Sequence, residues 1–100
     1  MIKNYTPHPL TIEINSAEPI ILPSEGSVRI DNEQIGTIND IPIYRPLAKV
    51  KGLPQESPGI YYVVSAIVKA VLKERRDLLV PYDLRKDTHG NIISCKGFSI

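Results

Sequence analysis

The sequence predicts a single α+β domain spanning residues 1–100. We expect a small twisted antiparallel sheet, or two sheets in a barrel-like arrangement, with one amphipathic helix and a C-terminal hairpin. Three observations lead to this prediction. A chain of 100 residues fits one domain. Nine prolines and six glycines imply many turns rather than a helical bundle. Only one segment has the apolar spacing of a helix, whereas most others resemble short strands.

Strands are expected along the first thirty residues. The segment 10–14 alternates apolar and polar side chains, which is the period of a half-buried strand. A turn is expected at 15–19, and the apolar run 20–22 then supplies a second strand. Alternation resumes over 28–30 after a further turn.

The middle of the chain continues this pattern. The polar residues 31–33 predict a hairpin or tight connection. Further strand is expected between residues 35 and 43, with an interruption at Asn39-Asp40. Pro42 and Pro46 confine that strand to an edge or a bulge, because proline cannot donate to a sheet ladder.

One helix is expected over residues 65–76. It directly follows a strand at 60–63, in which Tyr61 and Tyr62 face opposite sides. Ser65 is a suitable N-cap, and two arginines mark the expected end. The apolar stripe has the spacing i, i+3, i+4, i+7 and i+8 and consists of Val64, Ile67, Val68, Val71 and Leu72.

The tail predicts a hairpin. Residues 87–90 have turn chemistry, and Gly90 tolerates a positive φ. The arms would be 84–86 and 91–96.

Charge and cysteine content limit the classes of function. Residues 1–68 hold five Lys/Arg against seven Asp/Glu, and residues 69–100 hold seven against four, so the C-terminal third carries +3. That excess is weak for nucleic acid, which requires a whole basic face. Cys95 is the only cysteine, so neither an internal disulfide nor a cysteine-based metal site is expected. The chain lacks a signal-peptide core and a membrane-spanning run, which predicts a cytoplasmic protein without membrane contact.

Two polar segments predict a binding site. Residues 4–9 are stiffened by Pro7 and Pro9, which hold Thr6 and His8 extended and leave little entropy to lose on binding. Residues 75–83 carry an arginine pair, and arginine is well shaped for phosphate or carboxylate. The predicted ligand-binding residues are Asn4, Tyr5, Thr6, His8, Ser65, Arg75, Arg76, Asp77 and Tyr82.

Each candidate also has a structural interpretation. One arginine of the pair can simply neutralise Asp77 and order the turn. Ser65 is fully explained as an N-cap, although a helix start also attracts anions. Tyr5 and Tyr82 lie in the two polar segments and are the better candidates for stacking on a base. His89 fits a surface turn.

A catalytic role is ranked last. His8 has the chemistry of a base, but a loop histidine between prolines is equally consistent with its position. Cys95 in an alternating strand is typical of a small core residue. We expect no catalytic residue, no cofactor and no metal site.

Several motifs together resemble a family of small uncharacterised phage and prophage proteins. They are Asn4-x-Thr6-Pro7-His8, Tyr62-Val63-Val64-Ser65-Ala66, Arg76-Asp77-Leu78-Leu79-Val80-Pro81 and Asp87-x-x-Gly90-x-Ile92-Ile93-x-Cys95-x-Gly97. The resemblance implies a phage origin and the cytoplasm of an infected bacterial host. It implies no established activity.

In that context the expected function is sequestration. Small phage proteins without catalytic motifs are often inhibitors of host systems, and one kind binds a nucleotide-derived immune signal without turnover. We therefore expect a nucleotide-like small molecule as the partner and a homo-oligomer whose interfaces build the pocket, since so small a monomer hardly encloses such a ligand. The alternative is an interaction or virion-accessory module that binds a protein through an exposed strand edge.

Overall fold

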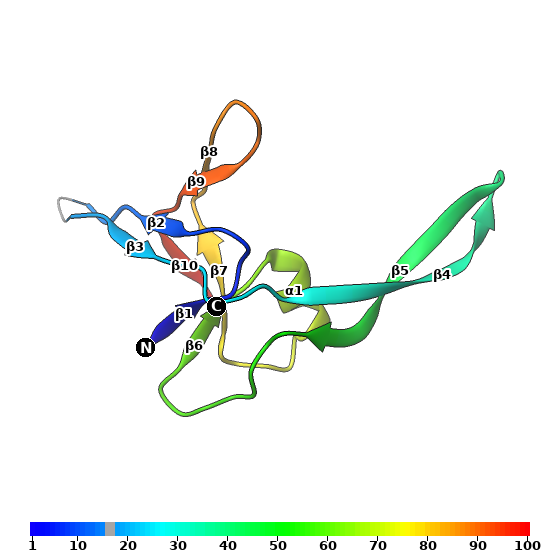
Figure 1. Cartoon of the computed structure of the whole chain (residues 1–100), viewed down its shortest axis with the longest axis horizontal. Helices are drawn as coiled ribbons and strands as arrows, with labels where there is room; N and C mark the ends of the chain where they lie inside the picture. Colours follow the sequence, from blue (N-terminus) through cyan, green and yellow to red (C-terminus); the bar gives the residue numbers. More distant parts are fainter. Residues whose placement is uncertain (16–17) are drawn as a thin grey trace.

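A four-stranded mixed sheet lies at the centre of the protein (Figure 1). The computed structural model describes residues 1–15 and 18–100. The first three strands of the sheet run parallel and the fourth runs antiparallel to its neighbour. In spatial order the strands are β1 (Ile2–Asn4), β6 (Tyr61–Val63), β7 (Leu78–Tyr82) and β10 (Gly97–Ser99).

The prediction of an antiparallel sheet is therefore wrong for the core. Strand β6 leads into helix α1 (Ala66–Val71), and the chain returns as β7 beside and parallel to β6. Parallel neighbours need a crossover of about a dozen residues or more, and the segment 64–77 provides it. The apolar run Leu78-Leu79-Val80 after the helix is compatible with a buried strand of such a unit.

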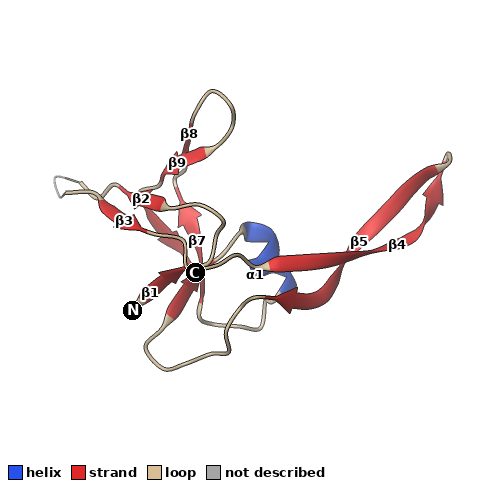
Figure 2. Cartoon of the chain, viewed as in Figure 1, coloured by secondary structure: helices blue, strands red, loops and turns tan. Residues whose placement is uncertain are grey.

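Both faces of this sheet are covered. Alternation places Tyr62 and Val64 on one face, where they pack with Val68 of α1 and with Leu78. Val63 and Leu79 lie on the other face and contact Leu10. Tyr62 is buried and Tyr61 is partly exposed, as their opposite orientations predict. The sheet is thus the core of an α+β domain (Figure 2).

The helix is confirmed but is shorter than the predicted span 65–76. Ser65 is the N-cap, and its hydroxyl accepts a hydrogen bond from the backbone N–H of Val68 at 3.3 Å. Leu72 ends the helix with φ −104° and ψ 44°. The chain turns there because Arg75 is held by contacts outside the helix, described below.

Two short hairpins flank the core. Strand β2 (Leu10–Ile12) lies within the strand predicted at 10–14, and it pairs antiparallel with β3 (Ile20–Leu22), the strand predicted at 20–22. The turn predicted at 15–19 includes residues 16 and 17, which lie outside the described residues. The predicted C-terminal hairpin is confirmed as β8 (Arg85–Lys86) and β9 (Ile92–Ser94), with Gly90 in the turn at φ 83°.

The longest strands form a projecting hairpin, which we call the arm. It comprises β4 (Arg29–Ile38) and β5 (Ile41–Lys51). Its turn is Asn39-Asp40, with φ of 50° and 63°, so the hairpin expected at 31–33 is wrong. Asn and Asp tolerate the left-handed backbone that a two-residue hairpin turn requires. The register shifts near Asp31 and Ile35, and both arm strands have a free edge within the described residues, which suits Pro42 and Pro46.

The arm gives the molecule its elongated shape, with extents of 53 × 38 × 19 Å (Figure 1). Only its root packs on the core, through Val28, Ile30 and Val50. At the root, Gly52 has φ 92°, and a Cβ added there would lie 2.6 Å from the carbonyl oxygen of Ser27. Within residues 1–15 and 18–100 the sheets do not close into a barrel. No described helix has the length and apolar character needed to cross a membrane.

Candidate functional site

The polar N-terminal loop is organised by one buried amide. Asn4 is fully buried at the end of β1. Its Nδ2 donates to the carbonyl oxygens of His8 at 2.9 Å and Leu22 at 3.1 Å. Its Oδ1 accepts from the backbone N–H of Thr6 at 2.9 Å and from the Thr6 hydroxyl at 2.6 Å. Asn4 therefore shapes the loop from inside, and its hydrogen-bonding groups are already occupied.

This loop forms one wall of a cavity of about 400 Å³. Three segments that are distant in sequence meet there: the N-terminal loop, the start of α1, and the chain from β7 into the C-terminal hairpin. The polar lining residues are Thr6, His8, Ser65 and Asn91. The apolar lining residues include Leu10, Val64, Val80, Pro81, Leu84 and Ile92. The cavity thus has an apolar floor and a few polar groups, which is usual for small-molecule sites.

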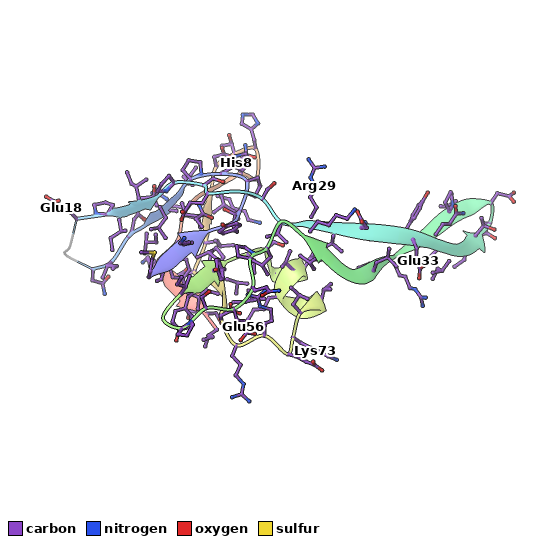
Figure 3. All side chains as sticks on the ribbon, turned by 60° about the horizontal axis from the view of Figure 1, so that its bottom comes forward. His8, Glu18, Arg29, Glu33, Glu56 and Lys73 are labelled. Carbon is purple, nitrogen blue, oxygen red and sulfur yellow. The ribbon has the colours of Figure 1, made fainter. Side chains whose placement is uncertain are left out.

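The predicted site residues are brought together only in part. Thr6, His8 and Ser65 line the cavity. The two polar segments of the sequence do meet there, but the second contributes Val80 and Pro81 rather than its arginines. His8 is exposed, and Figure 3 labels it among the crowded side chains of the body rather than on the arm. Its imidazole makes no hydrogen bond to any described residue, so it is available to a ligand.

Arg75 is bound within the protein. Its Nε donates to Asp77 Oδ1 at 2.9 Å, and a second guanidinium nitrogen donates to Oδ2 at 2.5 Å. A third contact of 2.9 Å reaches the carbonyl oxygen of Pro54, and the guanidinium carbon lies 5.9 Å from the centre of the Tyr62 ring. The hydrogen bond to Asp77 raises the pKa of Arg75 above its ordinary value. The pair fastens the loop before β6 to the start of β7.

The remaining predicted residues lie apart from the cavity lining. Tyr5 packs edge-on against Tyr62, with ring centres 5.4 Å apart, and so contributes to the core. Arg76 is exposed next to the buried Asp77. Tyr82 is 63% exposed at the end of β7. Their predicted role in binding a ligand stays a prediction.

A shallow basic depression adjoins the cavity. Lys69, Lys73 and Arg75 line it, and it shares Ala66 and Val80 with the cavity. Lys69 belongs to α1, and Lys73 follows two residues after the end of the helix. The fold places these lysines beside the site, since the shared residues belong to both depressions.

Asn91 is a lining residue that sequence reasoning missed as a candidate. It follows the turn at Gly90, where its N–H and that of His89 donate to Asp87 Oδ1 at 3.0 and 2.8 Å. These hydrogen bonds, that of Asn91 first, hold the pKa of Asp87 below its ordinary value. The polar residues of this turn predicted an ordered loop. They did not predict that the loop lies close to residues 6–8.

Cys95 is buried, 1% exposed, and lies away from the cavity lining. Burial raises the pKa of its thiol above the ordinary value of 9.0, although hydrogen bonds from the backbone of Gly97 and Tyr82 lower it in part. Since the thiolate is the nucleophile, this environment disfavours a reactive cysteine.

We therefore expect the native protein to resist thiol reagents at neutral pH, with reaction following global unfolding. Because the folded pKa is raised, the stabilisation is complete below pH 9.0 and is lost as the pH rises further. Timed labelling with a thiol reagent, with and without urea, measures the first effect, and urea titrations across pH 8 to 10 measure the second. Rapid labelling of folded protein would contradict this assignment.

Among the described residues no three His, Cys, Asp or Glu side chains are grouped to hold a metal ion. Comparisons of the chain with protein-family models, curated proteins and solved structures find no match.

Proposed function

We propose that this protein is a non-catalytic binder of a nucleotide-like small molecule, with the cavity between the N-terminal loop and the C-terminal hairpin as its site. The observation that carries the proposal is the meeting of three distant segments around one apolar-floored cavity with polar groups at its edge. The volume of about 400 Å³ lies at the lower end for ligand sites and suits a base or a sugar ring.

The chemistry of the lining supports recognition of such a ring. Apolar side chains such as Leu10 and Val80 offer a surface for a flat face, while Thr6, His8 and Asn91 offer groups for ring nitrogens and hydroxyls. The Thr6 hydroxyl donates to Asn4 and keeps its lone pairs for a ligand donor. The buried Asn4 presents Thr6 and His8 in a fixed arrangement, which reduces the entropy lost on binding.

Phosphate groups would lie in the adjoining basic depression. Lys69 and Lys73 supply positive charge there. Arg75 adds positive charge to the same depression, but its guanidinium is already paired with Asp77. Its role in binding phosphate is therefore secondary. In the sequence-based hypothesis the arginine pair contacts phosphate; the lining of the depression favours Lys69 and Lys73 for that role.

The proposal that the ligand is bound without being converted follows from the residues that line the cavity. Among the described residues, neither a carboxylate nor a thiol lines the cavity, so His8 has no partner that would orient it as a base. Binding without turnover, together with the resemblance to phage proteins, supports sequestration of a nucleotide-derived host immune signal. We further propose a homo-oligomer, because the cavity is open to solvent on the monomer.

Thermal shift and calorimetry test this proposal with ADP-ribose and cyclic dinucleotides as probes. We expect at least one probe to raise the melting temperature and to be recovered with unchanged mass. Thr6→Val and His8→Ala should each weaken its binding about tenfold, the worth of one hydrogen bond. Lys69→Ala should weaken a phosphate-bearing probe more than its nucleoside.

Lys96→Ala is the matched control, since Lys96 is an exposed cation that lines neither depression. It should leave the affinity unchanged. If no probe binds, or if Arg76→Ala abolishes binding while His8→Ala does not, the proposed site is wrong. A probe recovered with altered mass would contradict the absence of catalysis.

A second candidate function, protein interaction, is favoured by one observation. The arm exposes large apolar side chains far from the core.

A further inference from the structure

The hydroxyl of Thr6, in the lining of the cavity, offers a ligand only its lone pairs. Thr6 Oγ1 lies 2.6 Å from Asn4 Oδ1 and 3.0 Å from the carbonyl oxygen of His8. Both of these atoms are acceptors, so the single hydroxyl proton is used inside the loop whichever of them it reaches. Thr6 therefore meets a ligand as a hydrogen-bond acceptor.

Asn91 supplies a second acceptor to the same lining. Its Nδ2 lies 3.4 Å from Asp87 Oδ2, and its backbone N–H donates to Asp87 Oδ1 at 3.0 Å. Because the amide nitrogen faces the carboxylate, the amide oxygen is turned away from it; the reverse orientation would place two oxygens together. No described residue donates a hydrogen bond to that oxygen.

The backbone adds few donors to the cavity. Pro7 and Pro81 belong to the lining and have no N–H. The N–H groups of Val64 and Gly90 donate to carbonyl oxygens of the protein at 2.9 and 3.1 Å. These four lining residues therefore leave no backbone donor for a ligand.

Free donors and cations come from the segment 65–73. The hydroxyl of Ser65 accepts from a backbone N–H at 3.3 Å and keeps its own proton. Lys69 and Lys73 line the adjoining basic depression but not the cavity itself. The imidazole of His8 can donate or accept and favours neither kind of ligand. The site thus separates its acceptors, in the cavity, from its cations, in the depression beside it.

We propose that the site selects a ligand whose ring presents hydrogen-bond donors to Thr6 and Asn91 while its phosphate lies over Lys69 and Lys73. An amino-bearing base and a ribose with free hydroxyls both supply such donors. This inference rests on the proposed function and narrows it to one chemical class. A ring without donors would cover the two acceptor oxygens and remove their water without replacing its hydrogen bonds, which weakens binding.

Both acceptors are held in place before a ligand arrives. The fully buried Asn4 fixes Thr6 through its backbone N–H and its hydroxyl. Asp87 holds Asn91 through the backbone and the side chain. Groups that are already oriented lose little entropy on binding, and they cannot turn to suit a ligand of the opposite hydrogen-bonding character.

Calorimetry with three nucleotides tests the proposal on the full chain. Adenosine 5′-monophosphate carries both kinds of donor, purine riboside 5′-monophosphate lacks the amino group, and the 2′,3′-dideoxy analogue lacks the ribose hydroxyls. We expect at least one analogue to bind about tenfold more weakly than adenosine 5′-monophosphate, which is the worth of one hydrogen bond. The analogue that loses affinity identifies the donor as the amino group or a hydroxyl.

If both analogues bind at least as tightly as adenosine 5′-monophosphate, the selection for donors is wrong, whereas nucleotide binding stands. If none of the three binds, the inference fails as well, and the titration with ADP-ribose described above then decides the proposed function by itself.

Variants locate the acceptors through the ratio of the two affinities, for adenosine 5′-monophosphate and for the weaker analogue. Thr6→Val or Asn91→Ala should bring this ratio close to one, while Thr6→Ser keeps an acceptor and should preserve it. Asn15→Ala is the control for Asn91, because Asn15 is an exposed asparagine outside the lining. A merely structural role would weaken both nucleotides alike, so a ratio unchanged in both Thr6→Val and Asn91→Ala would refute the assignment. Circular dichroism checks the fold of each variant.

Discussion

Asp77→Ala is expected to lower the free energy of unfolding by about 3 kcal/mol, because it leaves the guanidinium of Arg75 in a mostly buried site without its carboxylate. The side chains of Arg75 and Asp77 are only 18% and 11% exposed. Urea denaturation followed by circular dichroism measures the effect.

The arm offers a matched control for this change. Glu33 and Arg45 also form an ion pair, through one carboxylate oxygen, but their side chains are 40% and 65% exposed. Glu33→Ala should cost less than about 1 kcal/mol, as solvent-exposed pairs do. Replacing both partners of the buried pair, Arg75→Met with Asp77→Leu, should be less damaging than Asp77→Ala alone. Equal small losses for both pairs would show that the buried pair does not hold the loop to β7.

Asn4→Ala is the second change with a large expected effect, a loss of about 3 kcal/mol or more. It removes an amide that is fully buried and leaves the carbonyl oxygens of His8 and Leu22 and the N–H of Thr6 without their partner. The loop that carries Thr6 and His8 should lose order at the same time. Urea titration measures the stability, and amide exchange at residues 6 and 8 measures the loop.

Two variants separate the amide from the mere presence of a polar group. Asn4→Asp keeps an oxygen for Thr6 but replaces the donor that faces two carbonyl oxygens, so it should be nearly as destabilised at neutral pH. Asn15→Ala removes an exposed asparagine and should stay within about 0.5 kcal/mol of the wild type. A tolerated Asn4→Ala would mean that the prolines alone shape the loop.

The elements set by local chemistry could be predicted from the sequence. Ser65 followed by an apolar stripe specifies the helix start, and Gly90 after three turn residues specifies the C-terminal hairpin. Both depend on residues close together in the chain. The helix end could not be placed, because it depends on Arg75 reaching Pro54, which is 21 positions earlier.

The pairing of strands that are distant in sequence could not be predicted from the local hydrophobic pattern. Nothing local in the run 78–80 distinguishes a parallel from an antiparallel neighbour; the crossover through α1 decides it. Polar residues at 31–33 resemble a turn, yet they belong to a strand that is exposed on both faces. The arm strands bury little, so their hydrophobic pattern carries almost no information on register.

In the candidate site, too, some features could be predicted from the sequence and others depend on the fold. Thr6, His8 and Ser65 were predicted from stiffness and polarity, and they line one cavity. Asn4 and Arg75 were chosen for the same chemical types, but burial uses their groups inside the protein. Residue type specifies what a side chain can bind, whereas only the fold decides whether the partner is internal or external.

The close approach at Gly52 has a mechanical consequence. The backbone there passes so near the carbonyl of Ser27 that a side chain has no room, so the two strands leave the body clamped together at their roots. A residue with a side chain at position 52 would have to push the two strand roots apart, and that shift would be carried along the whole length of the projecting hairpin.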